Sequence, residues 1–141
     1  MLNKLLSILS VTLLLVSFNS FSKDVTPSLL LGSWQCESES IISRYDKISG
    51  WSEFIDAGHE SIKLIYTKDA SMKDHDDFMV FVLNDDFKVK GSKSKFFEGE
   101  MLTATQEFIY VSNDQFKLVM DLFSPESYKS NSVALCTRIN K

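Results

Sequence analysis

Apolar residues recur at every second position over much of this chain, and this alternation limits the folds that it can adopt. Ile62, Leu64 and Tyr66 would share one side of an extended segment. Residues 115–123 repeat the pattern, with one side formed by Phe116, Leu118, Met120 and Leu122. Side chains of a β-strand alternate between two faces, whereas a helical face needs apolar residues three or four positions apart. The chain is therefore predicted to be all-β.

Turn-forming residues divide the chain into about seven to nine short segments of this kind. Residues 78–83 are apolar on both faces, and residues 87–91 alternate cleanly. Residues 107–123 are typical of a hairpin folded about Asn113-Asp114, and residues 132–139 form a last strand. Many short strands at regular spacing predict a barrel or a sandwich.

Helical signals are few. Thr26 followed by Pro27 can start a short helical turn, and residues 39–50 have moderate helical spacing that ends at a glycine. We expect at most one or two short helices in the whole chain.

The first 22 residues are predicted to be a cleaved signal peptide. A single cation precedes an uncharged apolar run over residues 5–18, and Ser20 and Ser22 supply the small residues of a cleavage before Lys23. The run is too short to span a bilayer comfortably, although a lone membrane anchor is a competing interpretation. We expect residues 23–141 to form a single domain, monomeric and without a membrane span, in a bacterial periplasm or in the medium.

The charge of that domain excludes one class of partner. The full chain has a net charge of −4, and removal of the signal segment with Lys4 leaves −5. Generic binding to nucleic acid needs clustered cations against the phosphates, so no nucleic-acid partner is expected. Nine phenylalanines, two tryptophans and four tyrosines remain after cleavage, which predicts a packed core rather than a disordered chain.

Two cysteines, Cys36 and Cys136, stand near the two ends of the domain. In an oxidising compartment such an even pair predicts a disulfide. In an antiparallel pair of strands, opposed residues have a constant sum of residue numbers. The register that joins Cys36 to Cys136 therefore also places Trp34 opposite Arg138, where the guanidinium can lie over the indole. Pairing of the first strand with the last would close a meander into an up-and-down barrel.

Gly32-Ser33-Trp34 on the first strand and Arg138 near the end of the last resemble the lipocalin and fatty-acid-binding-protein superfamily. The resemblance implies an up-and-down barrel whose tryptophan plugs one end while the basic residue packs across it. It is confined to the two ends of the chain. Fatty-acid-binding proteins commonly have a tyrosine two residues after that arginine, where this chain has Asn140, so we assign Arg138 a structural role.

Aromatic side chains are the candidates for a ligand-binding wall. An apolar ligand would contact a set drawn from several strands: Trp51, Phe54, Phe78, Phe81, Phe108 and Phe116. A small barrel can also fill its interior with such side chains, and the sequence leaves a hollow and a filled barrel open.

Two charged segments have alternative interpretations. Residues 68–77 include Asp74, His75, Asp76 and Asp77, which could bind a divalent cation or a basic protein but match no known metal loop. A solvated polar loop is the preferred interpretation. Four lysines (Lys88, Lys90, Lys93 and Lys95) could dock an anionic partner, or could point outward from a hairpin and keep it soluble, which we prefer.

No nucleophile elbow, histidine metal motif or recognisable carboxylate pair is present, so neither an enzyme, a metal nor a cofactor is expected. We expect an exported protein that binds a small apolar or amphipathic molecule inside its barrel. The alternative is an inhibitor or immunity protein that blocks a secreted enzyme through residues 68–77. A third hypothesis is an envelope assembly factor with a filled barrel.

Overall fold

The computed structural model describes residues 23–73 and 76–139, and the predicted signal peptide lies outside them. These residues form one short helix and eight strands. In chain order the elements are α1 (Pro27–Leu30), β1 (Gly32–Asp46), β2 (Gly50–Trp51), β3 (Ile55–Thr67), β4 (Phe78–Val82), β5 (Lys90–Phe97), β6 (Glu100–Ser112), β7 (Gln115–Ser124) and β8 (Tyr128–Arg138).

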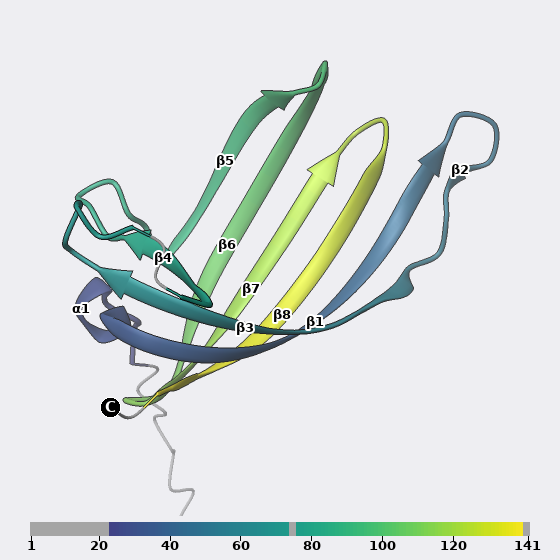
Figure 1. Ribbon diagram of the computed structural model, residues 1–141. Helices are drawn as coiled ribbons and strands as arrows, with labels where there is room; N and C mark the ends of the chain where they lie inside the picture. The colour runs from purple at the N-terminus through teal and green to yellow at the C-terminus, as the bar shows by residue number, and fades with distance from the viewer. Residues whose placement is uncertain (1–22, 74–75, 140–141) are drawn as a thin grey trace, which may run out of the picture.

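The strands form one curled sheet in the order β4-β3-β1-β8-β7-β6-β5, with β2 paired to the far end of β1. The predicted all-β class is confirmed, and so is the pairing of the first long strand with the last. All pairs are antiparallel except β3 with β4, which run parallel because a connection crosses back between them. The sheet is a half-barrel, and β4 and β5 are the two ends of its strand order (Figure 1).

The register between β1 and β8 agrees with the register that the residue numbers predict. Cys36 lies opposite Cys136 and Trp34 lies opposite Arg138. A disulfide joins the two cysteines and closes a separation of 100 residues. The two ends of the domain are thus tied side by side in the middle of the sheet.

The possible helix over residues 39–50 is absent, because β1 continues as a strand to Asp46. This segment has a strand on each side: β8 pairs with it as far as Arg44, and β3 as far as Ile42. Backbone pairing on both sides outweighs the weak helical spacing of its isoleucines. Residues 56–59 (Asp-Ala-Gly-His) have the composition of a turn, but they lie inside β3. Ser40 faces Gly58 and Ile41 faces Asp56, so that Ala57 forms a bulge.

The predicted strand at residues 87–91 also differs from the structure, since β5 begins only at Lys90. The irregular segment before it crosses one end of the half-barrel and contributes Leu83, Phe87 and Val89 to the core. Its end is held by a hydrogen bond of 2.8 Å from the Phe108 amide to the Val89 carbonyl.

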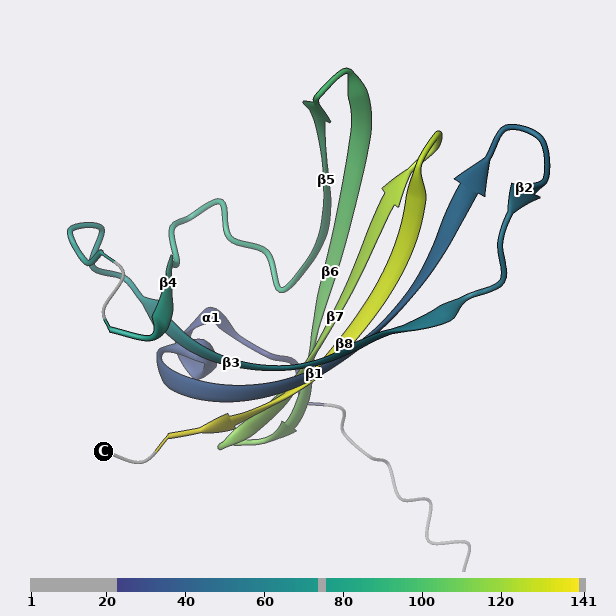
Figure 2. The ribbon, with the colours of Figure 1, turned by 45° about the vertical axis from the view of Figure 1, so that its right-hand side comes forward.

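The core occupies only one end of the sheet. There the buried side chains come from α1, β1, β3, β6, β7 and β8, and include Leu30, Trp34, Tyr66, Phe108 and Phe116. At the other end the hairpins β5–β6 and β7–β8 and the β1–β2 turn fan apart (Figures 1 and 2). The domain therefore has a packed end and an open end.

Gly32, at the packed end, leaves no room for a side chain. Its φ is +120°, and a Cβ added there would lie 2.9 Å from Nη1 of Arg138. Gly58 has a nearly identical φ of +117° but open space around its Cα. Gly58→Ala thus incurs only backbone strain, whereas Gly32→Ala adds a steric clash.

We expect Gly32→Ala to lower the free energy of unfolding by about 1–3 kcal/mol more than Gly58→Ala does. Urea unfolding followed by circular dichroism measures both values. Equal losses in the two variants would mean that Arg138 does not lie against Gly32.

Candidate binding groove

The closed end of the half-barrel is built around Trp34. Its side chain is fully buried, and its indole N–H donates a hydrogen bond of 2.7 Å to the carbonyl of Leu30, the last residue of α1. The ring of Phe116 meets it edge-on with centroids 4.6 Å apart. Because α1 is held by this bond, Trp34 seals the packed end as a plug rather than lining an open space.

Arg138 completes the plug from β8. The carbon of its guanidinium lies 4.2 Å from the centroid of the Trp34 ring. The group also donates hydrogen bonds of 2.8–3.2 Å to four acceptors: the carbonyls of Leu29, Leu31 and Asn113 and the carboxylate of Asp114. The guanidinium is thus engaged by the protein itself, which supports the structural role that the sequence assigns to it.

A lysine in place of Arg138 keeps the charge but cannot donate in so many directions. We expect Arg138→Lys to lower the free energy of unfolding by about 1–3 kcal/mol, because the partly buried carbonyls of Leu29 and Leu31 lose their donors. Asp114→Asn is the control: its side chain is 71% exposed, so the lost ion pair should cost less than about 1 kcal/mol. Urea unfolding of both variants tests this, and a lysine variant as stable as the Asp114 variant would contradict it.

Beyond the plug, β8 and β1 present mostly small side chains on the concave face. On β8 these are Ala134, Ser132 and Ser130, and the residues opposite them on β1 are Ser38, Ser40 and Ile42. The hydroxyls of Ser40 and Ser132 are 2.7 Å apart and bond to each other. Apart from Ile42, these side chains are short and leave space on the concave face of β1 and β8.

A groove of about 540 Å³ lies on this concave face beside the edge strand β5. Its floor is apolar, formed by Ala104 of β6 and by Met120 and Leu122 of β7. Gln106 lies among them, and its side-chain amide donates to the Lys88 carbonyl at 3.1 Å. The other lining residues are Asp86 and Lys88 from the segment before β5, Gly91, Ser92 and Lys93 of β5, and Thr105 of β6.

The surroundings shift the pKa values of two ionisable groups, Glu100 and Tyr66. The carboxylate of Glu100 accepts hydrogen bonds from the hydroxyls of Ser124, at 2.7 Å, and Ser127. These bonds, that from Ser124 first, lower the pKa of Glu100 below its usual value. Burial raises the pKa of the Tyr66 hydroxyl, so Tyr66 stays neutral in the core.

The aromatic residues predicted to form a ligand wall are dispersed by the fold, and none of them lines the groove. Phe108 and Phe116 are buried in the core, and Phe81 stacks on Tyr66 with centroids 5.5 Å apart. Phe78 lies beneath the ammonium of Lys63.

Trp51 and Phe54 lie at the other end of the sheet. There the ammonium of Lys129 stands 4.7 Å from the Trp51 ring and 5.2 Å from the Phe54 ring. The groove residues Met120 and Leu122 were placed on the inward side by the alternation of β7 but were not proposed as ligand contacts. The run of small residues on β8 is the sequence signal that could have indicated a hollow.

The charged segment of residues 68–77 is only partly described by the structure, since Asp74 and His75 are not among the described residues. Asp76 has a φ of 50° and stands with Asp77 in the turn that leads into β4. Asp69, earlier in the loop, accepts hydrogen bonds from the amide and hydroxyl of Ser71. Within residues 23–73 and 76–139, no three His, Cys, Asp or Glu side chains gather as a metal-binding group.

The one helix in this part of the chain is too short to cross a membrane.

No protein-family model matches the chain, and no curated protein matches it. Among solved structures, the chain is similar to an S-type phycobiliprotein lyase, CPES from Guillardia theta, with a TM-score of 0.37 and 10% sequence identity. The similarity covers 82% of this chain and 91% of that chain. Because a lyase is an enzyme, this finding contradicts the expectation of a protein that is not an enzyme. At so low a TM-score the similarity assigns neither an activity nor a ligand to this chain.

Proposed function

We propose that this chain is an exported, lipocalin-like binding protein that holds a small apolar or amphipathic molecule on its concave face. The observation that carries the proposal is the groove of about 540 Å³ with its floor of Ala104, Met120 and Leu122. Ligand pockets of proteins commonly have volumes of about 300–1,000 Å³ and combine an apolar wall with a few polar groups. The groove has this size and this composition.

The architecture supports the proposal because the side chains that stabilise the fold and the residues that form the groove lie in different parts of the sheet. The plug of Trp34 and Phe116 and the disulfide hold the sheet in its curve at one end. The small residues of β8 then keep the other end from filling. A ligand can reach the floor from the side where the sheet ends at β5, without any part of the core having to open.

The driving force is burial of apolar surface, which contributes about 0.8 kcal/mol per buried methylene before the costs of association. Straight-chain alcohols of increasing length should therefore bind progressively more tightly until the groove is full. Displacement of an apolar fluorescent dye by hexanol, octanol and decanol measures this series. A series without any length dependence would contradict binding in an apolar groove.

A substitution that fills the groove gives the sharper test. Ala104→Trp puts a large side chain on the groove floor, and we expect it to weaken decanol binding at least tenfold. Val133→Trp is the control, because Val133 is 39% exposed on the convex face of β8. Unfolding curves for both variants show whether each is folded. Equal decanol affinities in the two folded variants would place the ligand elsewhere.

Export is part of the proposal and has its own test. We propose that residues 1–22 are removed and that the remaining domain acts in the periplasm or outside a bacterial cell. Mass spectrometry of the protein recovered from fractionated cells should find Lys23 as the first residue. Recovery of the uncleaved chain from the cytosol would contradict this.

A further inference from the structure

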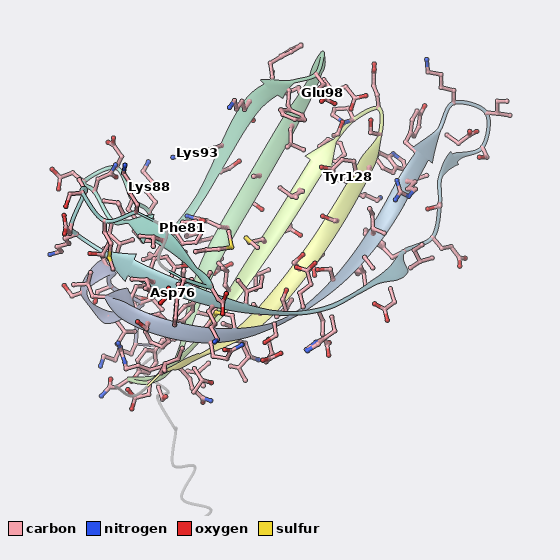
Figure 3. The ribbon with its side chains drawn as sticks, viewed as in Figure 1. Asp76, Phe81, Lys88, Lys93, Glu98 and Tyr128 are labelled. Atoms are coloured by element: carbon pink, nitrogen blue, oxygen red, sulfur yellow. A yellow bond between two sulfur atoms is a disulfide. The ribbon has the colours of Figure 1, made fainter. Side chains whose placement is uncertain are left out.

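The edge strand β5 carries cations on the face where a barrel strand is expected to be apolar. In the pairing with β6, Lys93 lies opposite Ala104 and Lys95 lies opposite Leu102. Ala104 shares its face of β6 with the buried Phe108, so Lys93 and Lys95 face the concave side and not outward as the sequence suggested. Lys88 precedes β5 and also lines the groove; it and Lys93 lie on the side of β5 toward β4 (Figure 3).

These cations are not neutralised by the described part of the protein. Lys90, on the other face of β5, forms an ion pair of 3.3 Å with Glu107. Within residues 23–73 and 76–139 no ion pair involves Lys88, Lys93 or Lys95. The nearby Glu100 carboxylate is engaged by two serine hydroxyls. Among the described residues that line the groove, Asp86 is the one carboxylate and Lys88 and Lys93 are the cations.

The lysines and the apolar floor residues lie in rows that run across the sheet from strand to strand. Lys93 of β5 is in register with Ala104 of β6, which is in register with Leu122 of β7. Gly91, Gln106 and Met120 form the neighbouring row. Because adjacent strands lie about 4.8 Å apart, each row passes from the edge to an apolar side chain over about 10 Å. The groove thus has a cationic side at the edge and an apolar side toward the middle of the sheet.

From this polarity we infer that the ligand is an anionic amphiphile, with a phosphate or carboxylate head held by Lys88 and Lys93 and an alkyl chain over Ala104, Met120 and Leu122. The inference rests on the proposed function and names the chemistry of its ligand. Two lysine ammonium groups, each a compact charge with three donors on a flexible stem, suit a head of either kind. Their place near the edge leaves the head close to water while the chain is buried.

Inward-facing charge on an edge strand has a second use, since it discourages pairing with another sheet. If that were the only role of these lysines, their removal would leave ligand affinity unchanged. The two explanations therefore predict different results from the same variant.

The test compares three probes with the same alkyl chain: decanoate, decyl phosphate and decanol. Binding to the protein expressed from the full 141-residue chain is measured by isothermal titration calorimetry at low ionic strength. We expect at least one of the two anions to bind about tenfold more tightly than decanol. The double variant Lys88→Gln/Lys93→Gln should lower anion affinity about tenfold and change decanol affinity less than twofold.

Lys90→Gln/Lys117→Gln is the matched control, because it removes the same charge from the opposite face of the sheet. We expect it to leave all three affinities within twofold of the original protein. The stronger of the two anions distinguishes a phosphate head from a carboxylate head.

Several results would overturn the inference. Equal binding of decanol and both anions would reject an anionic ligand while leaving the proposed groove intact. Unchanged anion affinity in the folded Lys88→Gln/Lys93→Gln variant would reject these lysines as the head-binding groups. Absence of binding by all three probes would reject the proposed function itself.

Discussion

Cys36→Ala/Cys136→Ala is expected to lower the free energy of unfolding by about 2–5 kcal/mol. The bond joins neighbouring strands at the centre of the sheet and closes a separation of 100 residues, for which the chain-entropy account gives about 4.7 kcal/mol. Domains of this size are stable by about 5–15 kcal/mol in total. The disulfide is therefore expected to supply a large fraction of the stability.

Alanine is chosen because both sulfur atoms are almost fully buried, with cysteine exposures of 1% and 0%. Serine would leave hydroxyls in the core and add a separate cost. Guanidinium unfolding measures the change. Reductant is the control: it should bring the original protein to the stability of the variant and leave the variant unaffected. Free thiols in oxidised, folded protein would contradict the disulfide.

Trp34→Ala is expected to cost about 3–5 kcal/mol, the usual loss for a large aromatic side chain in a core. Trp34 is 0% exposed, and its removal leaves Phe116 and the Arg138 guanidinium facing a cavity. The Leu30 carbonyl also loses its hydrogen bond from the indole, so α1 loses one of its attachments to the sheet. The cavity and the lost hydrogen bond both weaken the packed end of the sheet.

Trp51→Ala is the matched control for the second tryptophan of the chain. Trp51 is only partly buried, at the open end, where it contacts Tyr45 at 5.2 Å and Phe123 at 6.0 Å between ring centroids. We expect a loss of about 1 kcal/mol there, in line with ordinary substitutions. Urea titrations of the two variants give both values. A Trp34 variant as stable as the Trp51 variant would show that the plug does not hold the domain together.

The sequence predicted the faces of β7 well. The alternation placed Phe116, Leu118, Met120 and Leu122 on one side, and in the structure the first two are buried while the last two lie on the groove floor. The prediction succeeded because strand geometry alone sends alternate side chains to opposite faces. The outward orientation predicted for Lys93 and Lys95 was wrong, because it was inferred from their charge and not from the register of their strand.

Prediction from local sequence patterns also failed where pairing with neighbouring strands decides the conformation. The isoleucines of residues 39–50 resemble a helical face, yet β1 continues there as a strand with partners on both sides for most of its length. Residues 56–59 resemble a turn, yet they form a bulge within β3. In both places the hydrogen-bonding partners come from distant parts of the chain, and short-range patterns do not report them.

Chain chemistry by itself determined the strand class, the alternation of faces, and the register that pairs Cys36 with Cys136 and Trp34 with Arg138. Each of these follows from the repeat of a strand or from the covalent reach of a disulfide. The tertiary structure alone decided that the sheet ends at β4 and β5, and that Ala104, Met120 and Leu122 form a groove floor next to Lys88 and Lys93. Curvature and the packing of distant strands set these features, and no single segment encodes them.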